Sequence, residues 1–176
     1  ISLEPLVRAL RQACKGKPKN KIKVFITDPA GRQFDSRTAR ATAKRYQEVI
    51  IIAGRYEGLD DRISKILKSK NGFGVSTEKI SIGPYVLTGG EVPALVLIDA
   101  VARHVSGVLG KEESLEEKRL GIGIPAYTRP EIFRYLSKSY KVPPVLLSGD
   151  HKKIKTWRRK NRQADCHHRP RQDYRD

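Results

Sequence analysis

The stretch KISIGPYVLTGGE, residues 79–91, decides the fold of this 176-residue chain. It leads into a long apolar segment, Glu91–His104, whose composition predicts a mostly buried helix. Three glycines in the stretch leave no Cβ in the way, so main-chain N–H and C=O groups can line a pocket. Thr88 is placed to cap the following helix. We interpret the stretch as a ligand loop that ends at a helix N-terminus. An ordinary strand-turn-helix junction is the alternative.

Two further apolar runs end in the same manner. Glu48–Ala53 has the pattern of a strand buried on both faces and stops at Gly54–Gly58. Lys21–Thr27 is a second strand and ends in the turn Asp28–Gly31. In open α/β sheets, ligands bind beyond the carboxyl ends of the strands. The three glycine-containing loops therefore predict one shared pocket in an α/β protein, with a mostly parallel sheet and helices on both faces.

Apolar spacing predicts four more helices, with Asp150 capping the last of them. They cover Glu4–Lys15, Ser36–Tyr46, Asp60–Lys68 and His151–Lys160. Ser69–Lys79 is predicted to be a loop insertion, in which Gly72-Phe73-Gly74 is too weak a signal for a phosphate loop. Val145–Asp150 is predicted to be a short strand and turn.

The chain is strongly basic. It has 36 Lys and Arg against 19 Asp and Glu, a formal net charge of +17 and a pI of about 10.1. This charge favours a polyanionic partner, and nucleic acid over an anionic membrane surface, because no apolar run approaches membrane-spanning length. Cys14 and Cys166 lie far apart, without the spacing of a disulfide framework or a zinc site, so we expect no metal ligands and a reducing, cytoplasmic setting.

Several motifs resemble the bacterial tRNA (guanine-N1)-methyltransferase family of the SPOUT superfamily. The resemblance runs from about Leu3 to Arg159, and its motifs follow one another in the family's order. They are Val24–Gly31, Ile51–Arg62, Ser81–Glu91, Leu97–Arg103, Gly107–Gly110, Tyr127–Glu131, Val142–His151 and Trp157-Arg158. The resemblance implies a trefoil-knotted α/β enzyme that binds S-adenosylmethionine and tRNA and forms a homodimer.

The resemblance also implies how the chain is divided. Residues 1–105 would be the knotted cofactor-binding domain, lacking the family's first strand, with the trefoil knot at its C-terminal end. Residues 106–128 would be a flexible linker or lid. Residues 129–176 would be a shortened, basic tRNA-binding segment with a helical extension. The chain is thus expected to be shortened at both ends relative to the family.

The implied reaction transfers a methyl group to N1 of the guanine 3′ of the tRNA anticodon. Loss of the N1 proton leaves negative charge shared with O6, and the resemblance assigns the stabilising cation to Arg103. A surface arginine paired with Asp99 is the structural alternative. The family's linker aspartate is absent, so Glu117, or failing that Glu116, is our candidate for the proton acceptor.

The cofactor residues follow from the same resemblance. They are Thr27, Pro29, Gly54, Tyr56, Glu57, Ile82, Gly83, Pro84, Tyr85, Val86, Leu87, Gly89 and Gly90, with Asp28 as part of the same wall. The family also makes Mg²⁺ plausible. Two other functions stay open: a non-catalytic RNA-binding relative, and a knotted methyltransferase that acts on another RNA nucleotide.

Overall fold

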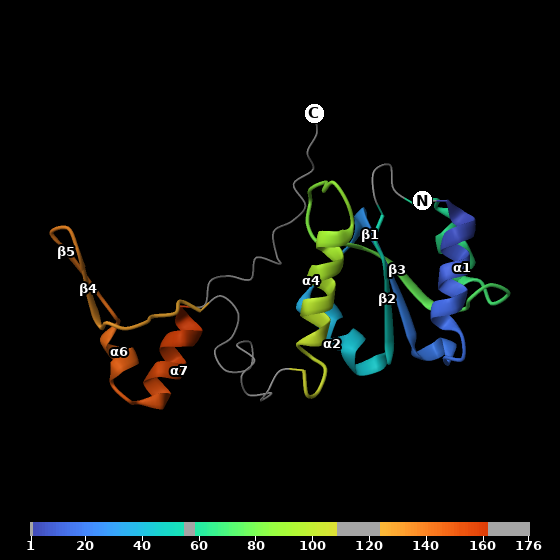
Figure 1. Cartoon of the computed structure of the whole chain (residues 1–176). Helices are drawn as coiled ribbons and strands as arrows, with labels where there is room; N and C mark the ends of the chain where they lie inside the picture. The colour runs from blue at the N-terminus through green and yellow to red at the C-terminus, as the bar shows by residue number, and fades with distance from the viewer. Residues whose placement is uncertain (1, 55–58, 109–123, 162–176) are drawn as a thin grey trace. The chain divides into compact units, whose positions relative to one another are not determined.

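The computed structural model describes residues 2–54, 59–108 and 124–161. The chain divides into two compact units, Ile1–Gly110 and Lys111–Asp176, which are described separately here. Figure 1 shows the elements of both units. No helix within the described ranges is long and apolar enough to cross a membrane.

The first unit contains a three-stranded parallel sheet. Its strands are β1 (Ile22–Gln33), β2 (Glu48–Ile52) and β3 (Ser76–Ser81), in the order β2-β1-β3. The helix between β1 and β2 is α2 (Ser36–Arg45), and the helix between β2 and β3 is α3 (Arg62–Lys68). The predicted parallel α/β sheet is therefore confirmed.

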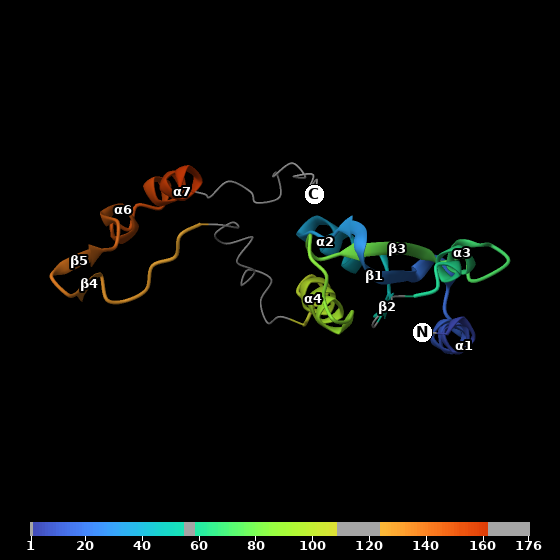
Figure 2. The ribbon, with the colours of Figure 1, turned by 90° about the horizontal axis from the view of Figure 1, so that it is seen from above.

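The N-terminal helix α1 (Leu3–Cys14) and the long helix α4 (Glu91–Ala102) lie on opposite sides of the sheet (Figures 1 and 2). A short 3₁₀ turn, η1 (Lys19–Lys21), connects α1 to β1. Alternation along β1 sends successive side chains to opposite faces, which gives the sheet an apolar core on each side. The predicted helices on both faces are confirmed.

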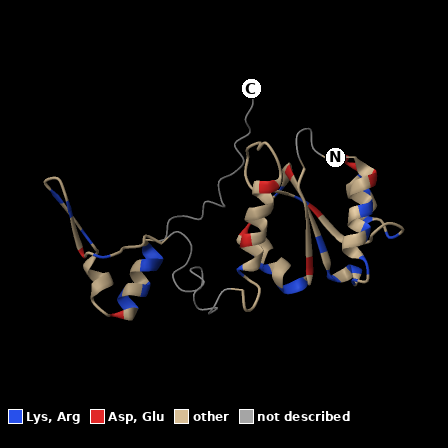
Figure 3. Ribbon diagram, in the orientation of Figure 1, with Lys and Arg blue, Asp and Glu red and all other residues tan. Residues whose placement is uncertain are grey.

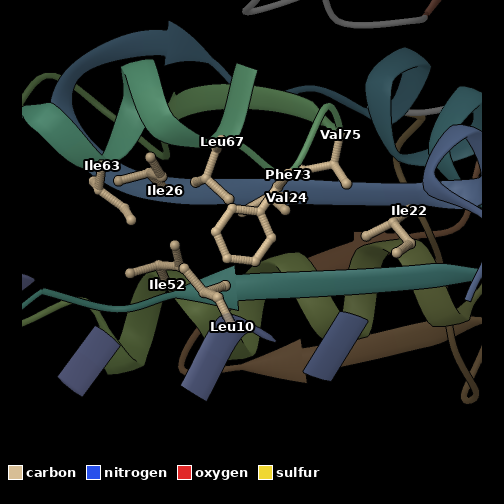
Figure 4. Close-up of a cluster of buried hydrophobic side chains, with 9 residues drawn as sticks. All are labelled: Leu10, Ile22, Val24, Ile26, Ile52, Ile63, Leu67, Phe73 and Val75. Atoms are coloured by element: carbon tan, nitrogen blue, oxygen red, sulfur yellow. The ribbon is translucent and has the colours of Figure 1, made fainter. Parts of the chain in front are cut away.

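The two cores share no residues. On one face, Val24 and Ile26 of β1 pack with Leu67 of α3, and Phe73 belongs to the same cluster (Figure 4). On the other face, Phe25 is fully buried in the cluster that contains Leu97 of α4. Burying a side chain of this size typically contributes about 1.5–3 kcal/mol, so the two cores fix β1 as the centre of the unit.

The central strand is longer than predicted because it resumes after the expected turn. Thr27 and Arg32 both pair with Ile80, so the residues between them loop out of the ladder. The Asp28 carboxylate accepts a hydrogen bond from the Ala30 N–H at 2.9 Å and closes this turn. The turn is thus confirmed, but it is an excursion within β1 rather than the end of the strand.

A partly buried charge network lies on β1 and β3. Lys23 is only 8 % exposed, and its Nζ donates to the Glu78 carboxylate at 2.8 Å while lying over the ring of Phe25. Arg32 donates to the other oxygen of Glu78. Burial alone would raise the pKa of Glu78, but the hydrogen bonds from Arg32 and Lys23 outweigh it and hold that pKa below its ordinary value of 4.5.

Within residues 124–161, the second unit contains a hairpin and two helices. The strands β4 (Ile132–Tyr135) and β5 (Lys138–Lys141) pair antiparallel. They are followed by α6 (Pro144–Leu147) and α7 (His151–Lys160). As predicted, the Asp150 carboxylate caps α7, accepting from the N–H groups of Lys152 and Lys153 at 3.0 and 3.1 Å.

Two predictions about local structure are wrong. The apolar run Val145–Leu147 belongs to the helix α6 and not to a strand, because Pro144 at its first position is preorganised for helix and the Leu146 N–H bonds the Pro143 carbonyl. The expected loop Ser69–Lys79 becomes strand at Ser76, since β3 pairs with β1 from that residue onward.

Candidate functional site

A pocket lies beyond the carboxyl ends of the three parallel strands, where the sequence predicts it. Its empty volume, which is partly open to solvent, is about 580 Å³. It is lined by Thr27, Asp28, Pro29, Gly54, Ile80, Ser81, Ile82, Gly83, Tyr85, Val86, Leu87, Thr88, Gly89, Gly90 and Pro93. We call this space the main-chain pocket, because glycines and loop backbone form much of its wall.

Gly90 joins this loop to the ends of the other two strands. Its N–H donates to the Gly54 carbonyl at 2.7 Å. A methyl group added at Gly90 would collide with Thr27 Oγ1 and would lie 2.8 Å from Ala53 Cα. The same methyl group would lie 2.9 Å from the Gly54 nitrogen. Only glycine allows this approach, so the loop after β3 reaches past the end of β1 to the end of β2.

The start of the loop is held by its own side chains. Ser81 Oγ donates to the Gly83 carbonyl at 2.8 Å and accepts from the Gly83 N–H at 3.2 Å. The Tyr85 hydroxyl donates to the Ile82 carbonyl at 3.3 Å, and its ring lies where a Gly83 side chain would be. These bonds fix the backbone of residues 81–85 as a preformed wall.

The loop leads into α4 without the predicted cap. Gly90, and not Thr88, is the N-cap residue, and no side chain accepts a hydrogen bond there. The Gly90 carbonyl accepts the first helical bond, from the Ala94 N–H at 2.9 Å. The close approach of Gly90 to Gly54 fixes where the helix begins, so Thr88 lines the pocket instead.

A charged cluster borders the main-chain pocket. Lys79 Nζ lies 3.1 Å from the Asp28 carboxylate and 2.8 Å from that of Asp61. The hydrogen bond from Lys79 lowers the pKa of Asp61, and the bonds to Asp61 and Asp28 raise the pKa of Lys79. These three residues line an adjoining pocket that shares Thr27 and Gly54 with the first one. The ion pair with Lys79 therefore favours the ionised form of the Asp61 carboxylate.

Nearly all the described residues that the sequence predicts for the cofactor line this one pocket. They are Thr27, Pro29, Gly54, Ile82, Gly83, Tyr85, Val86, Leu87, Gly89 and Gly90, together with Asp28, which was predicted as part of the same wall. Pro84 is the exception: it lies in the loop but does not line the pocket. Tyr56, Glu57 and Glu117 lie outside the described residues.

Sequence reasoning missed four residues of the pocket wall. They are Ile80, Ser81, Thr88 and Pro93. Each lies within three residues, along the chain, of a residue predicted to line the pocket. Their position next to the glycine-containing loop could therefore have predicted them. Ser81 could have been found as the last residue of a strand, where side chains face the crevice of an α/β sheet.

Arg103 lies at the other end of α4. It is the C-cap residue of that helix, and its N–H donates to the Asp99 carbonyl at 3.1 Å. Pro93, which lines the pocket, is in the first turn. Ten residues of helix span about 15 Å, and Arg103 is not among the residues that line the pocket.

Comparisons with known proteins show which family the chain resembles. The family model described as "tRNA (Guanine-1)-methyltransferase TrmD" matches residues 1–175. A tRNA (guanine-N(1)-)-methyltransferase of Carboxydothermus hydrogenoformans is 43 % identical over 163 residues, which are 91 % of this chain and 58 % of the relative. The protein of the same name from Dictyoglomus turgidum is 42 % identical over 160 residues, or 89 % of this chain and 58 % of the relative.

The Geotalea uraniireducens protein of that name is 43 % identical over 163 residues, again 91 % of this chain and 60 % of the relative. The chain therefore spans about 58–60 % of the length of these relatives. The family model matches nearly the whole chain, and each of these relatives is 42–43 % identical to it. The chain belongs to the tRNA (guanine-1)-methyltransferase family.

Proposed function

We propose that this chain transfers a methyl group from S-adenosylmethionine to N1 of the guanine 3′ of the anticodon in tRNA. The observation that carries the proposal is the main-chain pocket at the carboxyl ends of the strands. Ten of its wall residues are those that the family resemblance assigns to the methyl donor, and they come from three separate loops. Membership of the family supports the chemistry.

The pocket suits an adenosine-containing ligand. Main-chain groups of residues 82–87 offer donors and acceptors to the edge of an adenine ring, and Leu87 and Pro93 add apolar wall. Gly90 has no side chain, which lets the loop that forms this wall reach Gly54 at the end of β2. When bound, S-adenosylmethionine supplies a methyl group on a positively charged sulfur. The protein holds the methyl donor and the acceptor atom in line. Most of the rate enhancement of such a displacement comes from this positioning.

We infer that the loop crossing is part of a trefoil knot. The support is that residues 82–90 leave β3 on one side of β1 and bond to Gly54 at the end of β2 on the other side. Knotted protein chains are rare, and we infer a knot because the chain resembles a family of knotted enzymes.

The active form is a homodimer. The exposed face of α4 carries Val92, Leu95, Val96 and Ile98, which are 42–65 % exposed. An apolar face of this kind on a helix is typical of an interface. In a two-fold dimer built on α4, the C-terminal end of one helix can approach the N-terminal end of the other. Arg103 of one copy would then serve the pocket of the second copy.

The roles of the protein residues follow from the charge that develops. Arg103 stabilises the negative charge on O6 of the guanine as N1 loses its proton. Glu117, or failing that Glu116, accepts that proton from its place in a linker, residues 106–128, that acts as a lid. Residues 1–105 bind the donor and residues 129–176 bind tRNA. Two cysteines far apart in the sequence and a tRNA substrate fit a cytoplasmic setting.

The family resemblance makes Mg²⁺ plausible as a further cofactor, and the scheme above is written for the protein residues and the methyl donor. Within the described residues, no group of three or more His, Cys, Asp or Glu side chains is placed to hold a metal ion.

A radiolabelled methyl-transfer assay tests the proposal. The substrates are an unmodified tRNA transcript with guanine 3′ of the anticodon and the same transcript with adenine there. We expect label in the first and none in the second. Donor binding without transfer would indicate the non-catalytic RNA-binding relative. Label on another nucleotide would indicate a knotted methyltransferase of different specificity.

Subunit complementation tests the dimeric site. Copies that carry Gly90→Ala have a disrupted pocket but keep Arg103. Copies that carry Arg103→Ala keep the pocket but lack the arginine side chain. Either variant alone should be inactive. A refolded one-to-one mixture should regain about a quarter of the wild-type activity, because half of the dimers then hold one intact site out of two. A mixture as inactive as its components would contradict the shared site.

A further inference from the structure

The β4–β5 hairpin carries its aromatic residues on one face. The strands pair Phe133 with Tyr140 and Tyr135 with Lys138. Paired residues, and residues two apart along a strand, share a face. Phe133, Tyr135, Lys138 and Tyr140 therefore form one face, which we call the aromatic face. The opposite face holds Ile132 and Arg134, together with the residues paired with them.

The three rings of the aromatic face are largely exposed. Phe133, Tyr135 and Tyr140 are 55–59 % exposed, and every residue of the two strands is exposed. Within the described part of the chain, none of the three makes a ring contact or a side-chain hydrogen bond. By contrast, Tyr127 in the same unit packs edge-on against Trp157, with 6.2 Å between the two ring centroids. Three unpartnered rings on a short hairpin indicate a binding surface.

The charge of the hairpin selects the partner. Arg134, Lys138 and Lys141 lie in the two strands, which contain no acidic residue; Glu131 precedes them. Figure 3 shows Lys and Arg on the hairpin and along α7. Lys138 faces Tyr135 across the strands, so a cation lies on the aromatic face itself. This combination matches a ligand that has both flat rings and phosphates.

We propose that the aromatic face is a stacking platform for unpaired RNA nucleotides, separate from the main-chain pocket. Every base has a face that can stack on an aromatic side chain, but only an unpaired base can leave its own stack to do so. Duplex phosphates alone would need the cations and not the rings. This inference rests on the proposed function only in taking tRNA as the natural source of such nucleotides.

Binding of a fluorescent RNA to the full chain tests the platform. The probes are a stem-loop with 2-aminopurine in its unpaired loop and a blunt duplex of the same stem. The variants Phe133→Ile, Tyr135→Ile and Tyr140→Ile remove one ring each while keeping strand propensity. Each should weaken stem-loop binding by roughly 5- to 150-fold, the range for loss of one stacked base, and reduce the quenching of 2-aminopurine.

Matched variants separate stacking from charge and from folding. Tyr140→Phe keeps the ring and should bind the stem-loop within about 2-fold of wild type. Ile132→Ala removes an apolar side chain from the opposite face and should leave affinity unchanged. Lys138→Gln should lower the slope of log affinity against log salt by about one unit, whereas the ring variants should leave that slope unchanged.

Three results would overturn the platform. One is unchanged stem-loop affinity in all ring variants. The second is an equal loss of affinity for the blunt duplex, which would mean that the hairpin binds phosphates only. The third is an altered oligomeric state with unaltered RNA affinity, which would make a second copy the occupant. Calorimetry with S-adenosylmethionine, run in parallel, tests the proposed function separately. Ring-dependent RNA binding without donor binding would overturn that function alone.

Discussion

The main-chain pocket and the aromatic face are two proposed ligand-binding surfaces that are built in opposite ways. The pocket is built from loop backbone fixed between three strands, and its key residues, such as Gly83 and Gly90, contribute by having no side chain. The aromatic face is built from side chains on a two-stranded hairpin whose residues are all exposed. One surface is shaped before a ligand arrives, and the other has little packing of its own.

The difference indicates which kind of ligand suits each surface. A rigid backbone wall discriminates by shape and by fixed donors and acceptors, which fits one small molecule. Exposed rings and cations tolerate many bases and follow a flexible strand. Substitutions in the first unit should therefore act on donor binding and stability, and substitutions in the hairpin should act on RNA binding.

Gly90→Ala should have the largest effect. The added methyl group would meet backbone atoms of Ala53 and Gly54 that cannot move aside without disturbing β2. We expect donor affinity to fall by more than about 100-fold and stability by about 1–3 kcal/mol. Both are measurable from the thermal shift that S-adenosylmethionine produces.

Gly107→Ala is the control for Gly90→Ala. Gly107 has a φ of +83° and open space around it, so alanine there adds backbone strain without a collision. This variant should keep the wild-type thermal shift. An equal loss of the shift in both variants would mean that the shape of the pocket does not matter.

Glu78→Gln should have the next largest effect, on stability alone. It leaves Lys23 buried without its carboxylate, and breaking such a pair destabilises by about 3 kcal/mol. Urea unfolding measures the loss, and donor affinity should be unchanged because Glu78 does not line the pocket. Glu4→Gln, in an exposed pair with Arg8, should change stability by less than about 0.5 kcal/mol.

The contribution of Glu78 should also depend on pH. Its pKa is lower in the folded chain than its ordinary value of 4.5, so its stabilising effect is fully present above that value. The effect is lost as the pH falls through the lower, folded-state pKa. The stability gap between wild type and Glu78→Gln should therefore shrink on acidification below pH 4.5. A gap that widened with acid would contradict the ion pair.

The smallest effects should come from the helix caps, which exist in both units. The Asp35 carboxylate accepts from the Thr38 N–H at 2.7 Å at the start of α2, and Asp35→Ala should destabilise the first unit by about 1 kcal/mol. Asp150→Ala removes the matching cap of α7 and should only increase local amide exchange in that helix. Global unfolding of the first unit by Asp150→Ala would show that the units depend on each other.

Much of the first unit could be predicted from sequence because its signals are strong. Fully apolar runs such as Val49–Ile52 are typical of buried parallel strands, and glycines mark the loops that follow them. The sequence predicts that α4 starts at Glu91, but it does not predict the cap, because the contact between Gly90 and Gly54 overrides the capping preference of Thr88. Tertiary contacts decided the cap, and local propensity did not.

The second unit was harder to predict for the opposite reason. The β4–β5 hairpin has no buried face, so its sequence lacks the alternation by which strands are recognised. Its turn also uses Leu136 at a φ of +51°, where glycine or asparagine would be expected. Arg103 shows a further limit, since it lies at the end of α4 as predicted but does not line the main-chain pocket.

Hydrogen–deuterium exchange with and without S-adenosylmethionine tests the central claim most directly. If the main-chain pocket holds the donor, amides of residues 82–90 and around Gly54 should become protected, while those of residues 132–141 should not change. Protection confined to the hairpin or to α7, or no protection anywhere at saturating donor, would contradict the account.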